Sequence, residues 1–169
     1  MNESVSKSPE FALYHANAKG TGCAVKVKFH PWDVEKVREP FVSIEFAPQK
    51  SLEQGGQFAQ FDWAHSLPVK FDFHDLTVML QVLRGEIESV NDNRGFLQVT
   101  QIAKTTIRFR HTLEPVSGYA FEVYRELRAP NAGEEVERRA YFYLKPSEAL
   151  GIACAIEYAL AHIVFPNID

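Results

Sequence analysis

The sequence has few of the residues and patterns that mark an enzyme, a metalloprotein or a secreted protein. It contains two cysteines, Cys23 and Cys154, which lie far apart and have no metal-ligand spacing. Free cysteine behaves as a small hydrophobic residue, so we expect both side chains to be buried. Without a disulfide framework, the cytoplasm is expected in place of secretion. The six histidines are scattered and form no zinc-binding motif. These absences predict a protein with no catalytic residues, no metal and no cofactor.

The sequence also lacks a strong charge and a long apolar run. Its formal net charge is -4 and its pI about 5.9, which disfavours a dedicated duplex-DNA binder but leaves room for a local basic strip. The first residues are polar, so we expect a disordered leader at 1–10 and no signal peptide. The longest apolar run, 149–165, is interrupted by Glu157, Tyr158 and His162, so we expect no membrane span.

Apolar residues make up 46% of the chain, enough for one well-packed domain, which we place at 11–169. Many segments alternate apolar and polar residues, as Val42, Ile44 and Phe46 do with their neighbours. Period-two alternation is typical of a sheet with one buried and one solvated face. We expect at most one helical turn in the charged connector 33–39. The expected strands are 23–30, 41–46, 61–73 with a break near Pro68, 85–90, 96–102, 105–114, 118–127 and 136–144.

Two segments have the spacing of helices. Residues 74–84 carry an apolar stripe, with His74 or Asp75 as the N-cap and Gly85 as the stop. Residues 145–164 open with Pro146 and are apolar nearly all round. One sheet covers one face of such a helix, so we expect a homo-oligomer, a tetramer or a dimer, formed through residues 146–164. The stripe expected along one side of this helix is Leu150, Ala153, Ile156, Leu160 and Ile163.

The order of these elements is strands, a helix, strands and a helix. Antiparallel strands followed by a helix predict the α+β class, in contrast to alternating strand–helix–strand units. The two helices close units of similar length, about 19–85 and 86–165, which indicates a structural repeat within one domain.

Three stretches resemble the Whirly family of single-stranded-DNA-binding proteins. Residues 41–48, FVSIEFAP, are similar to the family's FVLLQFAP strand, and residues 60–63, QFDW, are similar to its QYDW. Residues 140–164 align without gaps with the family's last strand and helix. The resemblance covers roughly residues 19–165. The residues shared in the last stretch are Tyr141, Glu148, Ala155, Leu160 and His162.

The resemblance implies a specific architecture and assembly. The family fold is two antiparallel four-stranded sheets packed crosswise, each unit ending in a helix. Family members form tetramers through their helices and bind single strands along the sheet edges and between protomers.

Candidate binding residues follow from the chemistry of single-strand recognition, which combines a cationic groove with aromatic rings on which bases stack. The cationic candidates are Lys19, Lys26, Lys28, Lys70, Arg108, Arg110 and Arg125. The stacking candidates are Phe61, Trp63 and Tyr124. Each has a structural alternative, because charges that alternate with apolar residues commonly solvate a sheet face and large aromatics commonly fill a core.

Two functions therefore remain open. The resemblance implies a non-enzymatic protein that binds single-stranded nucleic acid, DNA in preference to RNA, in DNA maintenance or transcription regulation. The alternative is an oligomeric protein-interaction or scaffolding module with the same fold and no nucleic-acid ligand. The acidic net charge favours the alternative, and so does the run Lys19-Gly20-Thr21-Gly22, which keeps one lysine of the family's Lys-Gly-Lys-Ala motif.

Overall fold

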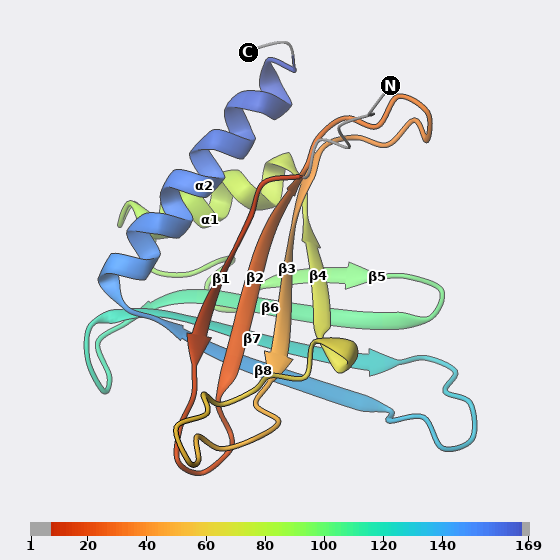
Figure 1. The fold of residues 1–169 in the computed structure, drawn as a ribbon. Coiled ribbons are helices and arrows are strands. Elements are labelled where there is room, and N and C mark those ends of the chain that lie inside the picture. Colours follow the sequence, from red (N-terminus) through yellow and green to blue (C-terminus); the bar gives the residue numbers. More distant parts are fainter. Residues whose placement is uncertain (1–7, 167–169) are drawn as a thin grey trace, which may run out of the picture.

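The computed structural model describes residues 8–166 and shows two antiparallel four-stranded sheets, each followed by a helix (Figure 1). The α+β class and the crossed-sheet architecture expected from the sequence are confirmed. Sheet 1 consists of β1 (Glu10–His15), β2 (Cys23–His30), β3 (Phe41–Pro48) and β4 (Leu67–Phe71), followed by α1 (Phe73–Leu83). Sheet 2 consists of β5 (Phe96–Val99), β6 (Ala103–Thr112), β7 (Gly118–Leu127) and β8 (Glu137–Leu144), followed by α2 (Pro146–Val164).

The core lies between the apolar faces of the two sheets. Buried residues alternate along the strands, as Val25, Val27 and Phe29 do along β2. Phe46 of sheet 1 meets Phe121 of sheet 2 edge-on, with ring centroids 5.8 Å apart. Such edge-on pairs stabilise a core beyond the effect of area burial. The largest fully buried side chains are Phe46, Phe71, Phe109, Phe121 and Phe142.

The strands of sheet 1 cross those of sheet 2 (Figure 1). Side chains of sheet 2 reach the open edge of sheet 1. An unpaired strand edge carries free backbone groups that must find partners. Here side chains of sheet 2 supply these partners, and their hydrogen bonds tie the two sheets together at β4. The hydrogen bonds run from Gln98 to the Lys70 carbonyl, from Arg125 to the Pro68 carbonyl and from Arg138 to the Ser66 and His65 carbonyls.

The predicted strand at 61–73 is wrong in its first part. Trp63–His65 is a 3-10 turn, and Phe61 forms only an isolated bridge with Gln49. The Asp62 side chain accepts a hydrogen bond from a backbone N–H of this turn, and Asp side chains of this kind favour turns over strands. The expected break at Pro68 is also wrong. Pro68 lies within β4 because an edge strand tolerates proline.

Three further differences concern the ends of the sheets. Strand β1 was not expected, and its first residue, Glu10, falls in the predicted leader, of which 1–7 lie outside the described residues. Residues 85–90 form turns and not a strand, because only Ser89 is bridged to β6. The connector 33–39 contains no helical turn and is closed by a bridge between Asp33 and Arg38.

Helix α1 begins earlier than expected, because Asp72 caps it in place of His74 or Asp75. The Asp72 carboxylate accepts from the backbone N–H of Asp75 at 3.0 Å, and the Asp75 carboxylate accepts from the backbone N–H of Asp72 at 3.3 Å. This reciprocal capping box satisfies two otherwise free donors. The helix ends before Gly85, as expected, and Gly85 has a φ of +73° that favours glycine.

Helix α2 packs on the core through a face that includes most of the predicted stripe, because Ile156 is buried and Ala153, Leu160 and Ile163 are partly buried against the core. Its buried residues are Ala149, Ile152, Ile156 and Ala159, whereas Leu150 is 67% exposed. The prediction that both cysteines are buried is wrong for Cys154. Cys154 lies exposed on α2. Cys23 is half-buried, and burial raises the pKa of its thiol to about 12.

By length and composition alone, α2 is long and apolar enough to cross a membrane. The expectation that this run is too short and too polar for a span is therefore wrong on those criteria. Core helices that pass the same test are mostly buried, whereas 22% of the most apolar stretch of α2 is buried. The remaining apolar surface of α2 faces away from the described fold.

We predict that Phe121→Ala lowers the free energy of unfolding by about 3–5 kcal/mol, because it removes a ring that joins both sheets in a close-packed core. Chemical denaturation followed by circular dichroism measures the change. Phe58→Ala is the matched control, since Phe58 is 86% exposed and should change stability little. Equal effects of the two substitutions would contradict this assignment of the core.

Candidate nucleic-acid interface

The residues of sheet 1 that alternate with its buried residues form an outer face turned away from sheet 2. On this face, strand pairing places Lys28 of β2, Ser43 of β3 and Lys70 of β4 side by side. Lys26 lies further along β2, opposite Glu45 of β3. The predicted contacts Lys26, Lys28 and Lys70 therefore share one face.

Aromatic side chains gather at one end of this face. The Lys26 amine lies 4.4 Å from the ring centroid of Trp63. The Tyr14 ring of β1 lies 6.3 Å from the Trp63 ring, edge-on, and 5.6 Å from the Phe61 ring. Tyr14 is 59% exposed, which leaves ring surface for a stacked base. We call Tyr14, Lys26, Phe61 and Trp63 the Trp63 cluster.

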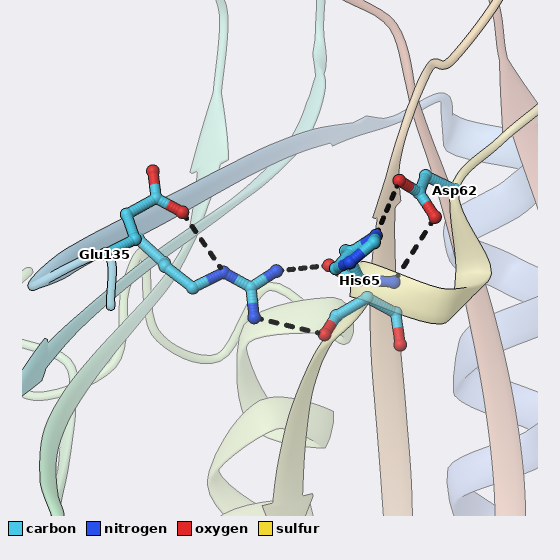
Figure 2. Close-up of polar contacts among 5 residues, drawn as sticks. Asp62, His65 and Glu135 are labelled. Atoms are coloured by element: carbon cyan, nitrogen blue, oxygen red, sulfur yellow. Dashed lines mark hydrogen bonds and ion pairs between the residues drawn. The ribbon is translucent and has the colours of Figure 1, made fainter. Parts of the chain in front are cut away.

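The 3-10 turn that carries Trp63 is held from two sides (Figure 2). Asp62 accepts hydrogen bonds from the backbone nitrogen of His65 at 3.3 Å and from its ring at 2.9 Å, and the ring contact lowers the pKa of the Asp62 carboxyl. From sheet 2, Arg138 donates to the His65 carbonyl, and its guanidinium lies 3.9 Å from Glu135. The position of Trp63 on sheet 1 thus depends on sheet 2.

The opposite end of the same face carries a ring surrounded by cationic groups. The Lys70 amine lies 4.3 Å from the Phe41 ring centroid, and the Arg38 guanidinium carbon lies 5.1 Å from it. The His30 ring stacks on Phe41 with centroids 4.2 Å apart and planes 10° apart. These groups leave Phe41 only 8% exposed. We call His30, Arg38, Phe41 and Lys70 the Phe41 cluster.

Carboxylates and one further lysine complete this surface. Glu10 lies 3.9 Å from Lys28, and Glu45 accepts a hydrogen bond from Ser66 at 3.2 Å. Lys19 lies exposed in the β1–β2 loop, where its backbone N–H donates to Asn17. The loop extends the face beyond the Trp63 cluster, because it follows directly on β1, which carries Tyr14.

The outer face of sheet 2 is a separate surface and carries Arg108, Arg110 and Tyr124. Glu122 lies 3.8 Å from Arg108 and accepts from Arg110 at 3.0 Å, so it partly neutralises both. Arg139 lies over the Tyr124 ring at 5.0 Å, and a hydrogen bond to Glu137 raises the pKa of Tyr124. An open groove of about 520 Å³ runs here, lined by Thr106, Arg108, Glu122, Val123, Tyr124, Arg139, Ala140 and Tyr141.

Arg125 belongs to neither outer face. Its side chain lies between the sheets, where it donates to the Thr105 hydroxyl at 2.9 Å and to the Pro68 carbonyl. Burial lowers the pKa of its guanidinium. The structure therefore places Arg125 away from the outer faces that carry the other candidate contacts, at a position where it joins β7 to β4.

Sequence reasoning missed several residues of the sheet 1 face. Tyr14 was overlooked because β1 was not predicted, and Arg38 because its loop has no periodic pattern. His30 and Phe41 lie in predicted strands, but only their cross-strand pairing brings the rings together. His30 lies on the same side of β2 as Lys26 and Lys28, so the alternation along this strand could have identified it as a residue of this face.

Comparison with known proteins gives matches in structure alone. Neither a protein-family model nor a curated protein matches the sequence. The crystal structure of WHY1 from Arabidopsis thaliana superposes with a TM-score of 0.73 at 13% identity, over 95% of this chain and 88% of that chain. The plant transcriptional regulator PBF-2 gives 0.68 at 16% identity, over 94% and 84%.

A guide-RNA-binding protein complex bound to a guide RNA is a third structural match. It has a TM-score of 0.62 at 16% identity, over 96% of this chain and 97% of that chain. The chain therefore has the fold of the Whirly proteins, as the resemblance of its sequence implied.

We predict that Arg138→Met loosens the turn that carries Trp63, because it removes the donors to that turn from sheet 2. In a Trp32→Phe background, Trp63 is the only tryptophan, so selective excitation of tryptophan reports on it alone. Its emission should shift to longer wavelength as the ring becomes more hydrated. Arg139→Met is the matched control, because Arg139 lies on the opposite face of the same strand. An unchanged Trp63 spectrum in Arg138→Met would contradict the role given to Arg138.

Proposed function

We propose that the protein binds single-stranded nucleic acid through the outer face of sheet 1, with no enzymatic activity and no cofactor. The observation that carries the proposal is the gathering of Lys26, Lys28 and Lys70 with Trp63 and Tyr14 on one face. The sequence shows these residues in separate segments. The strand pairing and the 3-10 turn bring them together.

The chemistry of this face suits a strand bound without strict sequence preference. Lysine amines attract the phosphate backbone, and a base stacked on an aromatic ring contributes about 1–3 kcal/mol. From His30 to Ala24 along β2, the face extends about 20 Å at a rise of about 3.3 Å per residue. Several successive nucleotides can therefore contact the Phe41 cluster, the lysines and the Trp63 cluster in turn.

Two of the structural matches support this proposal. One is described as a guide-RNA-binding complex bound to its RNA and another as a transcriptional regulator. We propose DNA in preference to RNA, and a role in DNA maintenance or transcription regulation in the cytoplasm. The resemblance of the sequence to a single-stranded-DNA-binding family supports that preference.

The proposal includes a homo-oligomer, a tetramer or a dimer, formed through α2. The helix exposes Leu150, Cys154 and part of Tyr158, with the exposed Phe165 directly after its last residue and Glu157 as the charged residue among them. Exposed apolar surface of this extent favours association, because burying it removes apolar area from water. A second copy of α2 would cover it.

A scaffolding module without a nucleic-acid ligand is the second candidate function. The observation that favours it is the pairing of Glu122 with both arginines of the sheet 2 face, which reduces the positive charge there. This reading predicts a stable oligomer that does not bind oligonucleotides at low salt.

We predict that a fluorescent oligothymidylate binds at low salt and is released as salt rises. Replacing Lys26, Lys28 and Lys70 together with Gln should weaken binding and reduce the slope of log K against log salt by about 2, since each phosphate contact on a single strand contributes about 0.7. Fluorescence anisotropy at several salt concentrations measures both quantities.

The matched control for this experiment is the triple substitution of Arg108, Arg110 and Arg139 with Gln, which removes the same charge from the sheet 2 face. It should change the slope less. If the wild-type protein does not bind at low salt, nucleic-acid binding is excluded and the scaffolding function is favoured. If the control loses as much affinity as the lysine variant, the site is not on sheet 1.

We predict that Leu150→Glu converts the oligomer to a smaller species, because it places a charge on the apolar face of α2. Size-exclusion chromatography with light scattering measures the mass. Val34→Glu is the control, since Val34 is 76% exposed in the β2–β3 loop and should leave the mass unchanged. A wild-type protein that is monomeric at micromolar concentration would contradict assembly through α2.

A further inference from the structure

We propose that Ser43 and its neighbours form a phosphate-binding subsite on the outer face of sheet 1, and that His30 makes phosphate binding there depend on pH. The subsite consists of Ser43, Lys28, Lys70, His30 and Arg38. This inference rests on the proposed function, because it assigns one backbone phosphate of the bound strand to one place on the face.

The position of Ser43 follows from strand pairing. Lys28 of β2 and Lys70 of β4 are its direct neighbours on either side, so the serine lies between two lysines whose flexible side chains carry the amines. His30 lies diagonally across from Ser43, and its ring Nε2 is 2.8 Å from the Ser43 Oγ. Two lysines that flank a serine on an open sheet face can bring both amines to a tetrahedral anion bound at the hydroxyl.

Arg38 closes the subsite from the β2–β3 loop. Both its guanidinium and the Lys70 amine lie over the Phe41 ring, at 5.1 and 4.3 Å. Contact with an aromatic face stabilises a cation and restricts its side chain. Phe41 therefore holds two cations near the His30 ring, which stacks on it.

The carboxylates around the subsite do not cancel its positive charge. Glu10 lies 3.9 Å from Lys28, and Asp33 lies 3.8 Å from Arg38, both at the long limit for an ion pair. Exposed pairs of this kind contribute little. Within residues 8–166, no carboxylate lies within ion-pair distance of the Lys70 amine.

His30 supplies the dependence on pH. The groups that face it are Lys28 on β2, Arg38 in the loop, Glu45 on β3 and Lys70 on β4. Burial is the main cause that lowers the pKa of His30 below its ordinary value, and the three cations lower it further against the opposing effect of Glu45. The free protein therefore holds a neutral ring at neutral pH.

A bound phosphate reverses this balance, since its negative charge stabilises the imidazolium and raises the pKa of His30. Affinity then increases as pH falls through the pKa of the bound state, and the increase ends below the pKa of the free state. Proton uptake also changes the hydrogen bond. The protonated Nε2 donates to the Ser43 Oγ, and the hydroxyl hydrogen of Ser43 is then free to donate to the phosphate.

The experiment measures the pKa of His30 by NMR titration of its ring, in the full-length protein, with the signal assigned by its loss in His30→Gln. Two probes are used separately: inorganic pyrophosphate, which tests the subsite, and a short oligothymidylate, which tests the bound strand. Thymine is chosen because it does not titrate at mildly acidic pH. Each probe should raise the pKa of His30, and a rise of one unit corresponds to an affinity gain of about tenfold for the protonated form.

Variants separate the subsite from general electrostatics. His30→Gln should abolish the increase in oligothymidylate affinity at acidic pH. Ser43→Ala should reduce the increase. His111→Gln is the matched control, because His111 is an exposed histidine on sheet 2 and should preserve the pH dependence.

The outcomes distinguish this inference from the proposed function. A rise in the pKa of His30 with pyrophosphate but no binding of oligothymidylate supports the subsite and excludes nucleic-acid binding. Oligothymidylate binding with an unchanged pKa of His30 overturns the subsite and leaves the proposed function standing. An unchanged pKa with both probes overturns the subsite, whether or not the variants fold.

Discussion

The crossed packing of the two sheets is the constraint on which the rest of the structure depends. Apolar residues of both sheets, Phe46 and Phe121 among them, are buried only because the inner faces meet. The crossing also brings the edge strand β4 within reach of polar side chains of sheet 2. Arg125 and Arg138 then satisfy carbonyls at that edge and set how the sheets lie. Burial of apolar area supplies the stability, and these directional hydrogen bonds determine the geometry.

That geometry connects the core to the candidate binding surface. Because Arg138 donates to the turn that carries Trp63, the aromatic end of the sheet 1 face is positioned by a residue of sheet 2. The other end is organised by sheet 1 and its loop, where Phe41 holds Arg38 and Lys70 beside His30. A single face thus offers a stacking end and a phosphate-binding end. The division suits a ligand in which bases and phosphates alternate along one strand.

The sheet 2 face is chemically different although it shares the same strand geometry. Its arginines are paired with Glu122 across the strands, and Arg139 covers the Tyr124 ring. Cross-strand pairs of opposite charge mainly stabilise the sheet that carries them. On the sheet 1 face, by contrast, the amines of Lys26 and Lys70 lie over the rings of Trp63 and Phe41.

The sequence by itself determined the class of fold and the parity of most strands. Period-two alternation placed β2 and β7 at their observed bounds, and it put Lys26, Lys28 and Lys70 on polar faces, because alternation reflects which side of a strand is buried. Only the tertiary structure decided which polar residues meet. In the tertiary structure, Arg125 lies between the sheets, and residues 61–63 are not part of a strand. The His30 ring is hydrogen-bonded to Ser43 and stacks on Phe41. Those contacts depend on strand register and on the crossing of the sheets, and neither is encoded in the local pattern of any one segment.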